Sequence, residues 1–261
     1  MGKIPDEERG PFQNVFLQEC EYMNQLIAVI LDSLQLLTLA FKGELTMTES
    51  METLIDSIFL NRVPATWAKL AFPSIRPLGS WMDNLSHRLL QLNQWKEEPT
   101  SIPKITFLNR LFNPQSFLTA IKQLNSQRTG TELNKLYIQT DITKRMFTEI
   151  TEPPREGAYC FGFHVEGARW DMASGQMEES IPRKPFSVVP VVCCKAAPVL
   201  PDGKEEKGVY QCPVYKTETR GATYVFTAQL KTKYPPQKWI LAGVSCILDV
   251  EGIGDYLPGK E

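Results

Sequence analysis

The sequence predicts an α+β protein in which a helical half precedes a strand-rich half. Up to about residue 125, apolar residues recur every three or four positions, as they do on one face of a helix. After about residue 135 they alternate with polar residues instead, which is typical of half-buried strands. Because the helices come first and the strands follow, the two kinds of element should occupy separate parts of the fold.

The first expected helix carries a long apolar stripe. Its apolar side chains are spaced alternately by four and three residues, and Gly43 follows the last of them. Such spacing places all of them on one helix face. The stripe covers fewer than four heptads and mixes side-chain sizes, which favours a helix packed in a bundle over a coiled-coil seam. Its members are Phe16, Cys20, Met23, Ile27, Ile30, Leu34, Leu37 and Phe41.

Further helices are expected in the first half. Thr46 and Glu49 have the spacing of a capping box ahead of a second apolar face. Pro64 marks the end of that helix or the start of the next short one. A longer helix should start at residues 80–83, and another should begin near Pro114. The expected apolar faces are Met51, Leu54, Ile55, Ile58 and Phe59 in the second helix, and Trp81, Leu85, Leu89, Leu92 and Trp95 in the long one.

Short strands are expected in the second half, because successive side chains there fall into two alternating sets, one for each face of a sheet. The last candidate strand, residues 239–250, is apolar enough to be partly helical. Five or six such strands can curl into a small antiparallel β-barrel, closed or incomplete. The candidates are residues 136–142, 159–165, 188–194, 209–215, 223–231 and 239–250.

A polar stretch at residues 126–131 separates the two halves. We therefore expect a helical subdomain, a bundle, over residues 1–128 and a β-barrel subdomain over residues 129–251. Residues 252–261 are rich in Gly and Pro and predict a flexible tail.

Composition and charge exclude several classes of function. The net charge is −2, from 28 basic and 30 acidic residues, so we expect neither a nucleic-acid footprint nor a polybasic membrane patch. The apolar stretch from Leu26 to Phe41 is interrupted by polar residues and is too short to span a bilayer. Six cysteines without a CxxC pair, in a sequence with no signal-peptide pattern, predict buried free thiols in a reducing compartment.

No catalytic, cofactor-binding or metal-binding residues are predicted. The sequence has no GxxxxGK[ST] phosphate loop and no GxSxG nucleophile elbow. Its two histidines, His87 and His164, are far apart and do not have the spacing of a zinc site. His164 is expected to be a hydrogen-bonded structural residue, and the adjacent Cys193 and Cys194 are expected to be packed thiols. The protein is therefore not expected to be an enzyme by itself.

Two short blocks in the second half have Gly or Pro to bend the backbone and aromatic residues to pack against it: residues 166–171 and 210–217. In the first block, Arg169 can pair with Asp171 or with Glu166, while Trp170 covers an apolar edge. This pattern predicts a hairpin corner. Because Arg and aromatic residues are also favoured at contact surfaces, Arg169, Trp170 and Asp171 are the candidate partner-contact residues as well.

In their order and spacing these blocks resemble the C-terminal domain of dynein heavy chains. The resemblance extends from about Phe12 to Val250. The stretch after Arg220 and Gly221 looks more like axonemal heavy chains of the outer-arm type than like cytoplasmic ones. Further blocks that match in order are residues 15–26, 41–43, 63–64, 77–81, 112–120 and 153–159.

The resemblance implies helices plus a small β-barrel without a nucleotide site. It implies a non-catalytic domain that packs on the AAA+ ring of the same heavy chain and modulates ATP-driven movement along microtubules. No cofactor is implied, and other dynein subunits would be only indirect partners. The implied location is the cytoplasm and the cytoskeleton, in the axoneme of a cilium or flagellum. Because such a domain would pack on a ring, we also expect an exposed apolar patch on its helical half.

Two other classes of function remain open from the residues alone. The protein can be a free-standing binding module, whose barrel mouth or sheet edge holds a small ligand or a peptide. It can also be an enzyme with an unrecognised site. A ligand in a polar barrel cavity would favour the first, and a strongly shifted Asp, Glu or Cys pKa in a cleft would favour the second.

Overall fold

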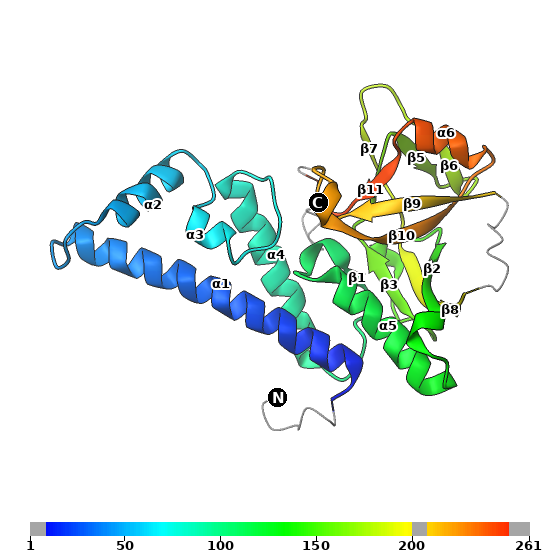
Figure 1. Cartoon of the computed structure of the whole chain (residues 1–261), viewed down its shortest axis with the longest axis horizontal. Helices are drawn as coiled ribbons and strands as arrows, with labels where there is room; N and C mark the ends of the chain where they lie inside the picture. The colour runs from blue at the N-terminus through cyan, green and yellow to red at the C-terminus, as the bar shows by residue number, and fades with distance from the viewer. Residues whose placement is uncertain (1–8, 200–207, 251–261) are drawn as a thin grey trace.

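Helices α1–α4 and the strands occupy opposite sides of the protein in the computed structural model, which describes residues 9–199 and 208–250 (Figure 1). The α+β prediction is confirmed. Helices α1–α4 lie on one side, the strands lie on the other, and α5 lies between them, in contact with α1 and with three of the strands. The flexible tail predicted for residues 252–261 lies outside the described residues. The helices are α1 (Pro11–Phe41), α2 (Glu49–Phe59), α3 (Ala65–Ala68), α4 (Leu78–Glu97), α5 (Pro114–Thr129) and α6 (Pro236–Leu241).

The long helix α1 begins at Pro11, whose fixed φ suits the first turn of a helix. It ends at Phe41, two residues before Gly43, which has a φ of +77°. Its predicted apolar stripe is buried or half-buried from Phe16 to Ile30, and Leu37 beyond is also buried. The predicted stripe residues Leu34 and Phe41 are exposed, although Leu37 between them on the same face is buried.

In length and mean hydropathy, α1 meets the criteria for a membrane-spanning helix, although the apolar run alone looked too short. The core helix of a globular protein passes the same test. The first turns of α1 pack in the core, where Phe12 lies 5.3 Å from Phe117 and Phe16 lies 5.4 Å from Trp95, measured between ring centroids.

The second helix starts two residues later than a capping box at Thr46 would require. Its N-cap is Thr48, whose Oγ1 accepts a hydrogen bond from the backbone N–H of Met51 at 3.4 Å. Thr48 has the extended backbone that an N-cap residue needs, so the predicted pairing of Thr46 with Glu49 does not form the cap. Two other helix starts agree with prediction: α3 follows Pro64, and Asn113 caps α5. The long helix α4 begins at Leu78, two residues before the predicted start at residues 80–83.

The described strands form three hydrogen-bonded sheets and do not close into one barrel. A four-stranded sheet has the order β1-β3-β8-β2, a five-stranded sheet has the order β10-β9-β11-β4-β7, and β5 and β6 form a hairpin. Most pairs are antiparallel, but β1 with β3 and β11 with β9 are parallel. The strands are β1 (Thr106–Phe107), β2 (Leu136–Ile142), β3 (Ala158–Phe161), β4 (His164–Glu166), β5 (Ala168–Asp171), β6 (Gln176–Glu179), β7 (Phe186–Val188), β8 (Val192–Pro198), β9 (Val209–Tyr215), β10 (Tyr224–Lys231) and β11 (Ser245–Ile247).

Side chains rather than a backbone ladder join the two larger sheets where β2 meets β10. The backbone N–H of Thr140 donates to Oε1 of Gln229 at 2.7 Å, and the backbone N–H of Gln229 donates to Oγ1 of Thr140 at 2.6 Å. A closed barrel needs backbone hydrogen bonds between strands all the way round. Because this seam is bridged by side chains, the barrel remains open there.

The strand predicted over residues 159–165 is divided between the two larger sheets. The backbone leaves the first sheet at Phe161 and enters the second at His164, and Gly162 between them has a φ of +99°. A Cβ at this position would lie 2.8 Å from Oδ1 of Asn109, so both the backbone angle and the close approach require glycine. As a result, residues that alternation assigned to two faces of one strand are buried together.

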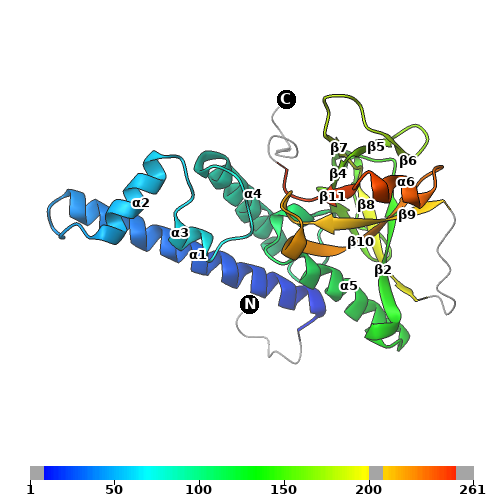
Figure 2. The same cartoon turned by 45° about the horizontal axis from the view of Figure 1, so that its top comes forward.

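The core is continuous across the two sides of the fold. One cluster of buried apolar residues runs from Phe12 in α1 through Trp81 and Phe117 to Leu248 after the last strand. Turned by 45°, the same arrangement shows α5 running under the sheets (Figure 2). This shared core fixes the base of the helical side against the strands.

Candidate functional site

The predicted contact block begins where β4 turns into β5. Gly167 separates the two strands with a φ of +78° and donates its backbone N–H to Pro185 O at 3.3 Å. From Ala168 the backbone pairs with β6 as an antiparallel hairpin. The block is thus a corner followed by a hairpin strand, as its Gly and aromatic content predicts.

Arg169 forms its ion pair with Asp171, at 3.3 Å between Nη1 and Oδ1. Glu166, the other candidate partner, pairs instead with Arg220 at 2.7 Å. Asp171 also accepts the backbone N–H of Ser174 at 2.9 Å, and its hydrogen bonds to Ser174, assisted by Arg169, lower the pKa of its carboxyl group. Arg169 and Asp171 are both partly exposed, so their outer edges are accessible to a partner.

Trp170 points the other way, into the protein. Only 6% of its surface is exposed, and its backbone N–H donates to Oγ of Ser187 at 3.3 Å. The three neighbouring residues therefore divide into a buried aromatic anchor and two flanking charged side chains. A direct partner contact is available to Arg169 and Asp171 but not to the indole ring.

The second block, residues 210–217, forms β9 and the turn after it, and it ties several elements together. The hydroxyl of Tyr210 donates to Val244 O at 2.7 Å, and burial raises the pKa of that hydroxyl. Lys216 donates from Nζ to Phe112 O at 3.0 Å, which links β9 to the loop before α5. These contacts give the block a structural role.

A buried charged cluster lies between the helices and the sheets. Glu19 on α1 accepts the backbone N–H groups of Phe112 at 2.6 Å and of Asn113 at 2.8 Å. Burial raises the pKa of its carboxyl group, although these two hydrogen bonds and the charges of Arg88 and Lys216 act to lower it. A carboxylate that binds the loop before α5 from within the core holds α1 and α5 in register.

Arg88 on α4 completes this cluster. Its Nε donates to Asn84 Oδ1 at 2.7 Å, and its Nη1 donates to Leu111 O at 3.0 Å. The guanidinium carbon lies 3.5 Å from the centroid of the Phe72 ring, and burial lowers the pKa of Arg88 to about 10. Neither Arg88 nor Glu19 was singled out from the sequence. The available signal was a charged residue on each otherwise apolar helix face.

The cysteine side chains and His164 lie in the core or, for Cys20, at its edge. All six cysteines are free, and all except the partly buried Cys20 are buried. The Sγ atoms of Cys212 and Cys246 lie 3.6 Å apart. His164 is fully buried with Nδ1 3.2 Å from Ile247 O, the structural role expected of it. In the described ranges, no three His, Cys, Asp or Glu side chains are grouped closely enough to hold a metal ion.

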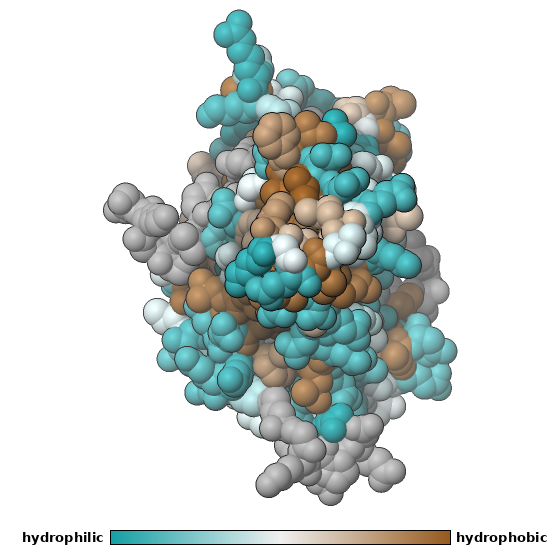
Figure 3. Space-filling model, turned by 90° about the vertical axis from the view of Figure 1, so that its left-hand side faces the viewer, coloured by the Kyte–Doolittle hydropathy of each residue, from teal (hydrophilic) through white to brown (hydrophobic). Residues whose placement is uncertain are grey.

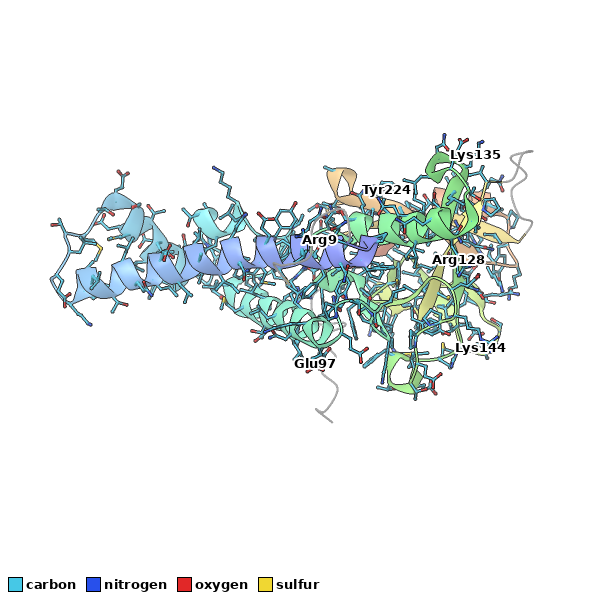
Figure 4. All side chains as sticks on the ribbon, turned by 90° about the horizontal axis from the view of Figure 1, so that it is seen from below. Arg9, Glu97, Arg128, Lys135, Lys144 and Tyr224 are labelled. Carbon is cyan, nitrogen blue, oxygen red and sulfur yellow. The ribbon has the colours of Figure 1, made fainter. Side chains whose placement is uncertain are left out.

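A polar groove of about 730 Å³ lies where α1 meets α5. In Figure 4, Arg9 marks the base of α1 at this junction. Amide and hydroxyl side chains dominate its lining, with Arg9 and Glu21 as its charged groups. The lining therefore offers hydrogen-bond donors and acceptors. The remaining polar lining includes Asn14, Gln18, Asn113, Gln115, Ser116, Thr119 and Gln123.

The second block, the buried charged cluster and His164 therefore have structural roles, and comparison with known sequences gives the class of the protein. The sequence profile of the C-terminal domain of dynein heavy chains matches residues 1–248. The protein belongs to this family, as the resemblance predicted.

Individual relatives are axonemal heavy chains. The sequence is 47% identical over 246 residues to the dynein beta chain of the flagellar outer arm of Chlamydomonas reinhardtii. It is 43% identical over 250 residues to the ciliary dynein beta chain of Tripneustes gratilla and to dynein axonemal heavy chain 9 of Homo sapiens. These matches cover 94–96% of this sequence but only 5–6% of the length of the relatives.

Proposed function

We propose that this protein works as the non-catalytic C-terminal domain of an axonemal dynein heavy chain. In this role it packs on the AAA+ ring and modulates ATP-driven, microtubule-based movement in a cilium or flagellum. The observation that carries the proposal is the match of nearly the whole sequence to the C-terminal domain of heavy chains named as flagellar, ciliary and axonemal.

The physical route is a contact that favours some ring conformations over others. A domain changes the motor's cycle only by binding one conformation more tightly than another. The rigid shared core allows this domain to transmit such a preference, since it holds the helical side and the sheets together. In this proposal, ATP hydrolysis belongs to the parts of the heavy chain upstream of this domain.

The direct test compares a dynein motor that carries this domain with the same motor truncated before it. The proposal expects the truncation to change microtubule gliding velocity or microtubule-stimulated ATP turnover, while the purified domain alone hydrolyses no ATP. Unchanged gliding and ATP turnover after truncation would refute a modulatory role. ATP turnover by the isolated domain would refute its assignment as non-catalytic.

We also propose that Arg169 and Asp171 contact the ring, with Trp170 supporting them from beneath. In the motor, Arg169→Ala and Asp171→Asn should alter gliding velocity or ATP turnover, while thermal stability changes little because exposed ion pairs contribute only about 0–1 kcal/mol. Arg128→Ala is a matched control, since Arg128 forms an exposed ion pair with Glu156 elsewhere on the surface. Equal behaviour of the Arg169 variant and this control would remove Arg169 from the contact.

A further inference from the structure

The far end of α1 exposes apolar side chains on several of its sides, between polar residues such as Asp32 and Gln35. Here we call residues 31–62, which comprise the last turns of α1, the following turn and α2, the helical tip. Leu34 and Phe41 continue the buried stripe, Leu31 and Leu36 lie on its two flanks, and Leu39 lies on the opposite side of the helix. All five are exposed, Phe41 to 69% and Leu31 to 52%. The apolar residues of an amphipathic helix are normally confined to the side that packs against a neighbour, so exposed apolar side chains on further sides are unusual.

Within the described residues, the helical tip is covered from one side only. Met51 and Leu54 of α2 are buried, and Trp67 of α3 donates its indole N–H to Ser33 at 3.0 Å. Phe59, at the end of α2, is 87% exposed. Figure 3 shows apolar surface between patches of polar surface at this end of the molecule. Contiguous apolar surface rimmed by polar residues is typical of an interaction site.

The polar rim of the helical tip is acidic. Glu49, Glu52 and Asp56 have the spacing of one helix face along α2, and each is exposed. No ion pair within the described residues neutralises these three carboxylates. Five acidic and two basic residues give residues 31–62 a net charge of −3, against −2 for the whole protein. Negative charge is therefore concentrated beside the exposed apolar side chains.

We propose that the helical tip docks on an apolar surface bearing lysine or arginine residues, contributed by the upstream part of the same heavy chain. This inference rests on the proposed function and assigns the contact to a particular face. Complementary charge selects a basic partner and disfavours like-charged ones. A second copy of the helical tip would bring the two acidic stripes together, which is repulsive.

The upstream occupant is also favoured by covalent connection. The region that this sequence matches covers only 5–6% of the length of the relatives, and the matched family is the C-terminal domain. A tethered surface has an effective concentration in the millimolar range for a short connection. An interface too weak to form between separate molecules therefore forms within one polypeptide.

Photo-crosslinking within the motor tests the assignment. A benzophenone side chain replaces Phe59 in the helical tip, or Leu241 on α6 as the control; Leu241 is 88% exposed and lies on the strand side. The expected result is an intramolecular crosslink from position 59 to an upstream peptide that contains apolar residues and Lys or Arg. Crosslinks from position 59 to a second heavy chain would overturn the choice of occupant.

The control position separates this inference from the proposed function. A third benzophenone variant replaces Arg169. If position 241 or position 169 crosslinks to the upstream part of the motor but position 59 does not, the domain packs on the ring through another face and this inference is wrong. If none of the three positions crosslinks within the motor, both the inference and the packing of the domain on the ring fail.

Charge reversal provides a second readout that does not depend on a crosslinker at the apolar contact. The triple variant Glu49→Lys, Glu52→Lys, Asp56→Lys should speed amide hydrogen exchange in α2 of the intact motor by about tenfold or more, since loss of docking exposes the helix. The control Glu97→Lys, Glu98→Lys, Glu152→Lys changes the net charge equally at other exposed sites and should leave α2 exchange unchanged. Equal exchange in both variants would overturn the acidic rim's role.

Discussion

Arg76 and Asp249 form a buried ion pair, with Nη2 and Oδ1 2.9 Å apart, although 173 residues separate them in the sequence. Arg76 also donates from Nη2 to Val250 O at 2.9 Å. One residue precedes α4 and the other follows β11. The guanidinium group therefore joins the helical side to the last described part of the strand side.

Breaking this ion pair should be strongly destabilising. Asp249→Asn keeps the size of the side chain but leaves the Arg76 charge buried without its counter-charge, and such losses cost about 3–5 kcal/mol. Chemical denaturation of the purified domain measures the change. Glu156→Gln, which removes the exposed pair with Arg128, should cost less than about 1 kcal/mol. A similar small loss for both variants would show that the Arg76–Asp249 pair is not a structural link.

Glu19 should make stability depend on pH in the acidic range. Burial raises the pKa of its carboxyl group above the ordinary value of 4.5, so the folded state holds this proton more tightly than the unfolded state. The resulting stabilisation is complete below pH 4.5 and is lost as pH rises through the folded-state pKa.

The variant Glu19→Gln lacks this titration and leaves one backbone N–H facing an amide group, which costs about 1–3 kcal/mol. The difference in unfolding free energy between wild type and Glu19→Gln should therefore be largest below pH 4.5 and should shrink toward neutral pH. Urea denaturation across pH 4–7 measures it. The exposed neighbour Glu21 provides the control variant Glu21→Gln. A difference that grows as pH rises would contradict the raised pKa.

Two glycines with similar backbone angles should respond very differently to alanine. Gly157 has a φ of +76°, and a Cβ there would lie 2.0 Å from the carbonyl oxygen of Cys194. Gly43 has a φ of +77° with open space around it. Gly43→Ala should cost about 1–2 kcal/mol from the backbone angle alone, and Gly157→Ala should cost several kcal/mol more or prevent folding. Thermal unfolding compares them, and equal melting temperatures would contradict the close approach.

The thiols should be nearly inert in the native protein. Burial raises the pKa of Cys20, and it raises that of Cys193 to about 11. Since the thiolate is the reactive form, a thiol reagent at neutral pH should modify Cys20 slowly and the five buried cysteines only after unfolding. Mass spectrometry of the labelled protein gives the sites. Rapid native labelling of Cys193 or Cys194 would show that β8 opens readily.

Local patterns predicted most of the elements, because each depends on its own residues. The alternation in residues 209–215 and 223–231 corresponds to β9 and to β10 within one residue, and the Asn113–Pro114 step begins α5. The α1 stripe also gave the correct helix, but its spacing carries no information on which turns find a partner. Leu34 and Phe41 therefore were expected to be buried and are exposed.

Contacts between residues far apart in the sequence were not predicted. The change of sheet at Gly162 depends on the distant Asn109 side chain, and the seam between β2 and β10 depends on Thr140 meeting Gln229. Arg169 had two candidate partners nearby in the sequence, Asp171 and Glu166. It pairs with Asp171, while Glu166 pairs with the distant Arg220. Burial of charge at Glu19 and Arg88 likewise depends on contacts that no local pattern contains.

The proportions of α1 have a mechanical consequence. Its 31 residues give a rod about 46 Å long, so a tilt of about 5° at the anchored base would carry the free end through about 4 Å. The base is held by aromatic packing in the core, where motions of that size are not tolerated. A stiff helix held at its base therefore converts a small rotation there into a displacement at its far end that is about as wide as a side chain. Conversely, a force applied at the far end acts as a torque on the sheets.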